Sequence, residues 1–342
     1  MRIGEVDLDA EVLVVAEIGN NHEGDVALGQ ELIGLAAEAG AGAVKFQTYR
    51  TEELVSRGNV ARFEQLKLFE LSHDEFERLA ATASDEGVMF LSTPFDLGSA
   101  EFLASLVPAF KIGSCENTFY PLLETVARFG KPVLLSGGMM DVLELADSKA
   151  RIEEVWRRQG VQQELAVLHC VTSYPVPPEE ANLAAISRLR EALGCTVGYS
   201  DHTLGIEAAA VSVALGARVV EKHFTVDKHY SKFRDHQLSA DPNDMAQLVR
   251  KIREIEALLG SGEKRPQPSE LAVMETVRRS IVARRDLPAG AIVTWDDLAW
   301  VRPGGGLAPG EEHLITGRRL RRSMAAGDEF SPRDLEETEG QA

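Results

Sequence analysis

The chain contains few cysteines, no long apolar run and no excess of positive charge, and each of these absences excludes a class of protein. Only Cys115, Cys170 and Cys195 occur in 342 residues. Because they cannot all pair and lie in or beside apolar runs, we expect reduced packing residues in a cytoplasmic protein. No apolar run reaches the roughly 18 residues of a membrane-spanning helix, and the acidic N-terminal segment does not resemble a signal peptide. The net charge of −18 disfavours nucleic acid or an anionic membrane as a partner, although a few lysines in a cleft could still bind an anionic substrate.

A short unit recurs through most of the chain: a helical stretch, a glycine and a nearly continuous apolar run. Glycine just past a helix end adopts the left-handed conformation that ends the helix, and such runs are typical of parallel strands covered on both faces. Eight units in about 260 residues predict an α/β fold, a (β/α)₈ TIM barrel over residues 1–260. A doubly wound sheet is the alternative, but no glycine-rich phosphate-binding loop follows the first strand. The expected strands are Val12–Ile18, Ala43–Gln47, Val88–Thr93, Phe110–Ile112, Pro132–Ser136, Leu165–Cys170, Cys195–Ser200 and Ala217–Phe224.

A different pattern begins after Gly260. Glycine, proline and charged residues predict a linker, assigned to residues 261–277, and residues 278–342 are expected to form a small domain with an internal repeat. Each copy predicts a turn, a strand and a short helix capped by Thr or Ser. A domain this small needs support, which favours docking onto a barrel. The first copy contains Pro288-Ala289-Gly290, Thr294 and Asp297, and 37 residues later the second contains Ala325-Ala326-Gly327, Ser331 and Asp334.

Two histidines stand in similar contexts 21 residues apart, in Ser-Asp-His202-Thr and Glu-Lys-His223-Phe-Thr. Each follows an expected strand, so both imidazoles should emerge at the C-terminal face of the barrel, where ligands bind. Two convergent imidazoles can hold a divalent metal. The alternative is two unrelated polar strand ends, but the acids beside both histidines favour the functional interpretation.

Two lysines, Lys45 and Lys111, lie inside otherwise apolar strands. A buried lysine needs an anionic partner, and the Ser and Thr hydroxyls at neighbouring strand ends suggest a phosphate or a carboxylate. Two alternatives remain: ion pairs with the barrel acids Glu17 and Glu221, and a Schiff-base lysine. Glu17 itself lies within an apolar strand, which favours a functional role. For His22, a loop that closes on a helix N-cap is the simpler interpretation.

Several motifs together resemble the sialic acid (N-acetylneuraminate) synthase family. The resemblance spans essentially the whole chain, in order, and the last domain resembles the antifreeze-like (SAF) domain of that family. It implies a transferase of the N-acetylneuraminate synthase type, which condenses phosphoenolpyruvate with the open aldehyde form of an N-acetylated hexose to give a nonulosonic acid and phosphate. The motifs are AEIGNNHEGD (16–25), AVKFQT (43–48), STPFD (92–96), KIGS (111–114), SYP (173–175), GYSDHT (198–203), EKHFT (221–225) and VRPGGG (301–306).

The resemblance also implies roles for individual residues. His202 and His223 would bind Mn²⁺, with Mg²⁺ or Co²⁺ as alternatives, and Glu17 would manage protons. Arg302 would reach from the small domain into the barrel of the other subunit, which implies a domain-swapped homodimer. Phosphoenolpyruvate would be held mainly through its carboxylate by Lys45, Thr93, Lys111 and Ser136, and through its phosphate by Ser114, Thr172 and Ser200. The sugar would face Glu17, Gln47, Tyr174 and Asp235.

Two departures from the family pattern leave the acceptor sugar open. Thr172 stands where sialic acid members often have Asn, and the segment 229–234 before Asp235 differs from the Pro-Gly-Pro-Asp type of some members. N-acetylmannosamine, its 6-phosphate and a 2,4-diacetamido sugar are therefore all candidates. A metal-dependent barrel aldolase or sugar isomerase that does not use phosphoenolpyruvate is the alternative enzyme. A binding or scaffold protein is disfavoured, because no expected ionisable position is replaced by an apolar residue.

Overall fold

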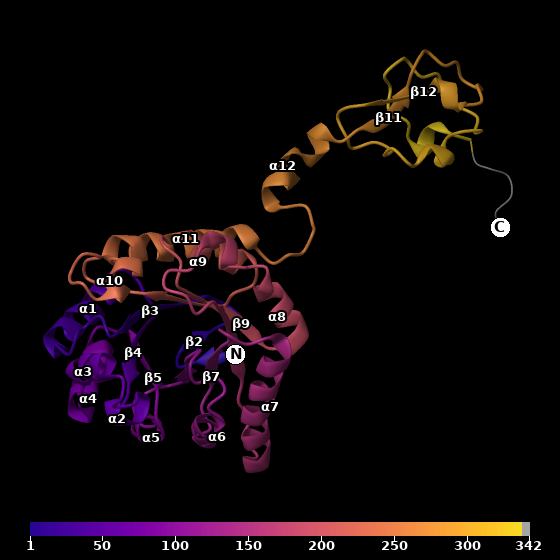
Figure 1. Cartoon of the computed structure of the whole chain (residues 1–342). Helices are drawn as coiled ribbons and strands as arrows, with labels where there is room; N and C mark the ends of the chain where they lie inside the picture. Colours follow the sequence, from indigo (N-terminus) through magenta and orange to yellow (C-terminus); the bar gives the residue numbers. More distant parts are fainter. Residues whose placement is uncertain (337–342) are drawn as a thin grey trace. The chain divides into compact units, whose positions relative to one another are not determined.

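The computed structural model describes residues 1–336, so the last six positions of the expected 278–342 domain lie outside the described residues. The chain divides into two compact units, Met1–Ser261 and a second unit that begins at Gly262 (Figure 1). Within the described residues, no helix is both long enough and apolar enough to cross a membrane.

The first unit is the expected barrel of eight parallel strands. The hydrogen-bonded order is β5-β4-β3-β10-β9-β8-β7-β6, so the last strand pairs with the first and turns the sheet back on itself. β5 and β6 lie in contact at the seam. The strands are β3 (Leu13–Gly19), β4 (Ala43–Thr48), β5 (Met89–Pro94), β6 (Phe110–Ile112), β7 (Val133–Ser136), β8 (Leu165–Cys170), β9 (Thr196–Asp201) and β10 (Val219–His223).

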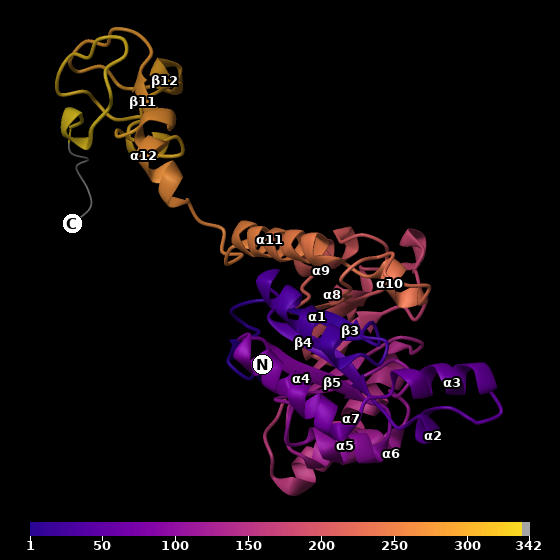
Figure 2. The same ribbon diagram turned by 90° about the vertical axis from the view of Figure 1, so that its left-hand side faces the viewer.

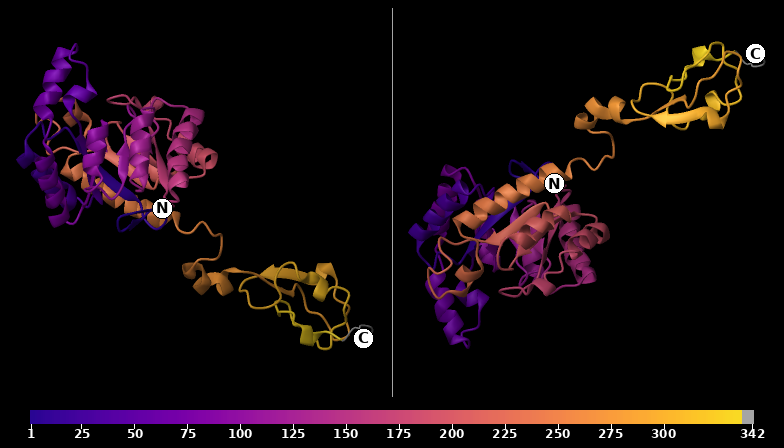
Figure 3. Two further views of the ribbon diagram at one scale, coloured as in Figure 1. Left: turned by 90° about the horizontal axis from the view of Figure 1, so that it is seen from below. Right: turned by 90° about the horizontal axis from the view of Figure 1, so that it is seen from above.

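Helices surround the strands, as the views of Figures 2 and 3 show. Side-chain caps begin many of them: Asp25 accepts from two backbone N–H groups of α1, and Asp141 forms a capping box with α7. Gly160 and Gly194 end α7 and α8 in the left-handed conformation that the glycine pattern predicts. The helices are α1 (Val26–Glu38), α4 (His73–Asp85), α5 (Leu97–Leu103), α6 (Tyr120–Arg128), α7 (Val142–Gln159), α8 (Ala185–Leu193), α9 (Glu207–Ala214) and α11 (Pro242–Leu259).

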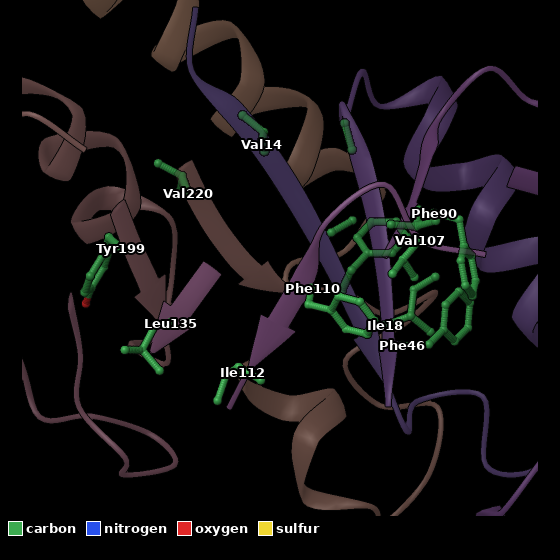
Figure 4. Close-up of a cluster of buried hydrophobic side chains, with 14 of the residues drawn as sticks. Val14, Ile18, Phe46, Phe90, Val107, Phe110, Ile112, Leu135, Tyr199 and Val220 are labelled. Atoms are coloured by element: carbon green, nitrogen blue, oxygen red, sulfur yellow. The ribbon is translucent and has the colours of Figure 1, made fainter. Parts of the chain in front are cut away.

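Two layers of apolar side chains hold the barrel together. The larger layer lies between strands and helices, where Ile18, Phe46, Phe110 and Tyr199 are among the members (Figure 4). The second layer fills the barrel interior near the beginnings of the strands. A short hairpin, β1 (Arg2–Ile3) and β2 (Val6–Asp7), contributes its apolar residues to that interior layer. The hairpin therefore covers the N-terminal end of the barrel, which leaves the C-terminal end for a site.

The second unit has the expected repeat. β11 (Ser280–Ala283) pairs antiparallel with β12 (Leu298–Val301), and the one-turn helices η2 (Trp295–Asp297) and η4 (Pro332–Asp334) occupy equivalent places. Thr294 and Ser331 begin these helices with matching capping boxes. Arg285 and Arg322 form matching ion pairs, each 2.6 Å long, with Asp297 and Asp334. The second half of the expected linker is helical, as α12 (Pro268–Val277), and η3 (Glu312–Leu314) completes the unit.

Candidate active site

A cavity of about 240 Å³ opens among the C-terminal ends of the barrel strands. A wider hollow of about 620 Å³ lies between α6 and α7, but charged helix-surface residues line it and no strand end reaches it. The chemistry-bearing residues are in the smaller cavity. Thirteen of the fourteen expected site residues line it: Glu17, Lys45, Gln47, Thr93, Lys111, Ser114, Ser136, Thr172, Tyr174, Ser200, His202, His223 and Asp235. The fourteenth, Arg302, belongs to the second unit, so its approach to a barrel stays a prediction.

Strand register explains why these side chains converge. Glu17 of β3 pairs with Lys45 of β4 on one side and with His223 of β10 on the other. Ser200 of β9 pairs with Glu221 of β10. Alternate residues of a strand point to the same face, so the inward-facing members of neighbouring strands form one continuous lining.

Two lysines and two glutamates form a buried charge network in this lining. Lys45 Nζ lies 2.7 Å from Glu17 Oε2 and 3.7 Å from Glu221 Oε2, while Lys111 Nζ lies 3.9 Å from Glu221 Oε1. Lys45 therefore forms ion pairs with Glu17 and Glu221, which is one of the alternatives to a phosphate or carboxylate ligand that the sequence left open. Burial raises the pKa of Glu17. Burial alone would lower the pKa of Lys45, but Glu17 and Glu221 outweigh it and raise that pKa.

Lys111 is less well compensated than Lys45. Its Nζ donates to Ser136 Oγ at 2.6 Å and to the Ile112 carbonyl at 3.1 Å, and among the described residues the carboxylate that pairs with it, Glu221, lies 3.9 Å away. Burial lowers the pKa of Lys111 below its ordinary value. A buried cation with room for another acceptor is suited to an anionic ligand.

Two hydroxyl groups, those of Ser114 and Thr172, line the same cavity as Lys111. A Cβ atom at Gly138 would lie 2.3 Å from Thr172 Oγ1 and 2.5 Å from Ser114 Oγ, so glycine is the residue that lets the backbone pack this closely against the two hydroxyls. Thr172 Oγ1 is buried and has no hydrogen-bond partner among the described residues. Asn117 Nδ2 donates to the carbonyls of Ser136 and Gly138 and thereby holds the loop in place. The two hydroxyls are donors of the kind that a phosphate group requires.

The two expected metal ligands face one another, with ring centroids 5.3 Å apart. His202 Nδ1 lies 2.9 Å from the Val171 carbonyl, so Nδ1 donates there and Nε2 is the nitrogen left for a metal ion. Burial alone would lower the pKa of His202, but its contacts with Cys170 and the Val171 carbonyl outweigh burial and raise that pKa, so a metal would have to displace a proton from Nε2. His223 Nδ1 is buried without a hydrogen-bond partner in the described chain, and burial lowers the pKa of His223 well below its ordinary value. A neutral imidazole is the form that binds metal. The described residues contain no group of three His, Cys, Asp or Glu side chains placed to hold a metal. A metal here would therefore take its other ligands from water or substrate.

The sequence interpretation of Cys170 as a packing residue is incomplete. Although buried, Cys170 lines the cavity, with Sγ 3.8 Å from His202 Nδ1 and 3.5 Å from Ser114 Oγ. Cys115, which is exposed, lines the same cavity. A cysteine at the end of an apolar strand carries no local signal that separates packing from a site. His22 behaves as expected: its Nδ1 accepts from Gly24 N at 3.0 Å, beside the Asp25 cap of α1.

Sequence analysis also missed Glu116, which lines the cavity from the turn after β6. Only 6% of its surface is exposed, and its Oε2 has no hydrogen-bond partner within residues 1–336. Burial raises the pKa of Glu116 to about 7. A carboxyl group with this pKa can gain or lose a proton near neutral pH.

Glu116 is expected to destabilise the protein at alkaline pH. Because its folded pKa of about 7 exceeds the ordinary value of 4.5, the folded state resists ionisation. Any stabilisation from the protonated form is complete below pH 4.5 and is lost as the pH rises through about 7. Glu116→Gln should therefore raise the free energy of unfolding by about 3 kcal/mol at pH 8 and change it little at pH 4.5. Urea unfolding at both pH values measures this, with the exposed Glu101→Gln as control, and an equal effect at both pH values would contradict it.

Comparison with known proteins agrees with this architecture. Residues 32–264 match the NeuB family and residues 278–336 match the SAF domain. The chain is 46% identical to the uncharacterized protein MJ1065 of Methanocaldococcus jannaschii and 41% identical to N,N'-diacetyllegionaminic acid synthase of Legionella pneumophila, over 92% of both chains in each case. The crystal structure of N-acetylneuraminic acid (sialic acid) synthetase from Leptospira borgpetersenii, in complex with citrate, is 34% identical with a TM-score of 0.76. It covers 80% of this chain and 95% of that one.

Proposed function

This chain belongs to the NeuB family, and from that premise we propose that it condenses phosphoenolpyruvate with an open-chain N-acetylated hexose to give a nonulosonic acid and phosphate. The observation that carries the proposal is the cavity itself, which gathers thirteen expected residues from strands all around the barrel. The related synthases of legionaminic and sialic acids support the reaction class.

Phosphoenolpyruvate is placed against the lysines. Lys45 and Lys111, together with Thr93 and Ser136, hold its carboxylate, and Lys45 already donates to Thr93 Oγ1 at 3.1 Å. The phosphate lies against the part of the cavity lined by Ser114, Thr172 and Ser200, and it accepts from their hydroxyl groups. Ser200 Oγ donates to Glu221 Oε1 at 2.8 Å in the present structure, so it must rotate to reach the phosphate.

His202 and His223 would hold a divalent ion, most simply Mn²⁺, and such an ion supplies Lewis acidity toward the sugar aldehyde. The two imidazoles fit this role because His202 presents Nε2 and His223 has a buried nitrogen free for a ligand. Tyr174 packs against His202 with ring centroids 4.1 Å apart and limits how far that ring can turn.

Two carboxyl groups are available to move protons. Glu17 accepts from Gln47 Nε2 at 3.1 Å and has a raised pKa, and Glu116 has a pKa of about 7. Both line the cavity within the barrel mouth. We assign to them the proton transfers that occur as the enol carbon of phosphoenolpyruvate attacks the aldehyde carbon, one water molecule adds at the carbon that bears the phosphate, and phosphate leaves by cleavage of the carbon–oxygen bond.

The sugar occupies the outer half of the cavity, against Gln47, Tyr174 and Asp235. Arg234 lies over the Tyr174 ring at 4.8 Å and pairs with Asp235 at 3.1 Å, so the segment that departs from the family pattern forms part of this wall. Arg302 of a second subunit would complete the site in a domain-swapped homodimer. Legionaminic acid synthase and N-acetylneuraminate-9-phosphate synthase are both among the relatives, so both kinds of acceptor belong in the test.

Phosphate release from phosphoenolpyruvate, measured with Mn²⁺, tests the proposal. The acceptors are N-acetylmannosamine, its 6-phosphate and a 2,4-diacetamido sugar. We expect release with one of them, none without acceptor, and loss of activity on chelation of the metal. Turnover of an acceptor without consumption of phosphoenolpyruvate would instead identify an aldolase or isomerase.

A further inference from the structure

A buried ion pair lies directly behind the two histidines of the cavity. Lys222 and Asp201, which are 1% and 0% exposed, place Nζ and Oδ2 3.0 Å apart. Each is the chain neighbour of a histidine, Asp201 of His202 and Lys222 of His223. Because side chains alternate along a strand, the ion pair faces the helices while both histidines face the cavity.

The ion pair holds the backbone on both sides of His202. Asp201 Oδ1 accepts from Thr203 N at 2.8 Å. This is an Asx-turn, in which an aspartate side chain binds the backbone N–H two residues later, and His202 is the residue enclosed by the turn. Lys222 Nζ donates to the Thr203 carbonyl as well as to Asp201. Tyr199 donates its hydroxyl to the same oxygen, Asp201 Oδ1, at 3.1 Å, while Lys222 binds Oδ2, so both oxygens of the carboxylate are held. Lys222 therefore contacts the residue on each side of His202, Asp201 through its carboxylate and Thr203 through its carbonyl.

The same lysine links the two strands that carry the histidines. Lys222 and Asp201 are register partners in the β10–β9 ladder, so their side chains add a second connection where the ladder ends. Val220 and Phe224, two residues before and after Lys222, are apolar and fully buried, and the ion pair also contacts the Tyr199 hydroxyl and the Thr203 backbone. An apolar pair could fill such a place at least as stably, because burying two charges costs much of what their attraction returns. A geometric role explains the charges better than stability does.

We propose that Asp201 and Lys222 are positioning residues, which set the separation and orientation of His202 and His223 for one divalent ion. The proposal rests on the metal role in the proposed function. Metal ligands depend on the groups that orient them, and loss of such a group typically costs about 10- to 100-fold in metal affinity. The ion pair orients the ligands through the backbone and has no contact of its own with the ion.

The test compares two variants with the unmodified full chain. Asp201→Leu combined with Lys222→Met replaces the ion pair by apolar groups and should retain the fold. Asp201→Asn keeps an acceptor for Thr203 N–H and removes only the charge, so it serves if the double variant fails to fold. We expect Mn²⁺ dissociation constants, measured by electron paramagnetic resonance without substrate, to rise about 10- to 100-fold in the double variant and about tenfold in Asp201→Asn.

Co²⁺ absorption gives a second readout that loss of stability alone would not change. Its visible bands should shift in both variants, while Lys131→Met, a partly buried lysine far from the histidines in the chain, should leave the bands and the Mn²⁺ affinity unchanged. Unaltered Mn²⁺ affinity and Co²⁺ bands in folded variants would overturn the positioning role. If His202→Ala also leaves Mn²⁺ affinity unchanged, the metal assignment fails first, and the positioning role fails with it.

Discussion

His223→Ala is expected to abolish specific Mn²⁺ binding and to lower phosphate release from phosphoenolpyruvate by roughly 10²- to 10³-fold or more. A Lewis acid at the aldehyde contributes several kcal/mol, and each 1.36 kcal/mol is a factor of ten in rate. His223 is one of two imidazoles that converge in the cavity, and its Nδ1 lacks a hydrogen-bond partner in the part of the chain described. Isothermal titration with Mn²⁺ and single-turnover assays measure the two effects.

His169→Gln is the matched control for this experiment. His169 also lies on a barrel strand, β8, and is also buried, but its Nε2 is bonded to the Ala181 carbonyl at 2.8 Å and it does not line the cavity. We expect this variant to bind Mn²⁺ with normal affinity. Normal Mn²⁺ affinity and normal activity in folded His223→Ala would instead contradict the assignment of His223 as a metal ligand and the role of the metal in the proposed mechanism.

The barrel could be predicted because its signals are local. The glycine before each strand and the apolar run after it are properties of neighbouring residues, as at Gly194, which ends α8 at φ 59° just before β9. The short helix α5 and the segment α3 (Val60–Phe69) escaped prediction. In α3 only Leu66 and Phe69 are buried, so its apolar residues do not mark a face. Short helices within loops are stabilised by tertiary contacts with residues far away in the sequence, and a short stretch of sequence does not reveal these contacts.

The convergence of the site's side chains in one cavity could be predicted from the sequence, whereas their contacts with one another could not. Polar residues at strand ends converge in any parallel barrel, and this is why thirteen of the expected side chains line one cavity. The ion pairs could not be predicted, because the 2.7 Å contact of Lys45 with Glu17 depends on the register of β3 against β4. The raised pKa of Glu116 could not be predicted either, because it comes from burial in the folded barrel and not from the neighbours of Glu116 in sequence.

Lys111→Met is expected to lower kcat/KM for phosphoenolpyruvate by about 10²-fold, mainly through a higher KM. Lys111 is buried, donates to Ser136 Oγ at 2.6 Å and lies 3.9 Å from Glu221 Oε1, so its positive charge is available to pair with an incoming carboxylate. Hydrogen bonds to charged groups contribute about 1.5–3 kcal/mol each, which corresponds to this loss. Steady-state kinetics and direct titration of phosphoenolpyruvate measure the effect, and circular dichroism verifies that the variant is folded.

Lys131→Met is the control, because Lys131 is a partly buried lysine whose Nζ donates to the Val107 carbonyl before β6, away from the strand ends that form the cavity. It should leave KM for phosphoenolpyruvate unchanged. An unchanged KM in Lys111→Met would show that Lys45 is the one lysine of the two that binds the carboxylate.

The Schiff-base alternative makes a different prediction: borohydride in the presence of a carbonyl substrate would trap a covalent adduct in the unmodified protein and not in Lys111→Met. Lys111 donates to Ser136 and to the Ile112 carbonyl, which suits a cation that binds an anion, whereas its lowered pKa is what a Schiff-base lysine requires, so trapping by borohydride decides between the two roles.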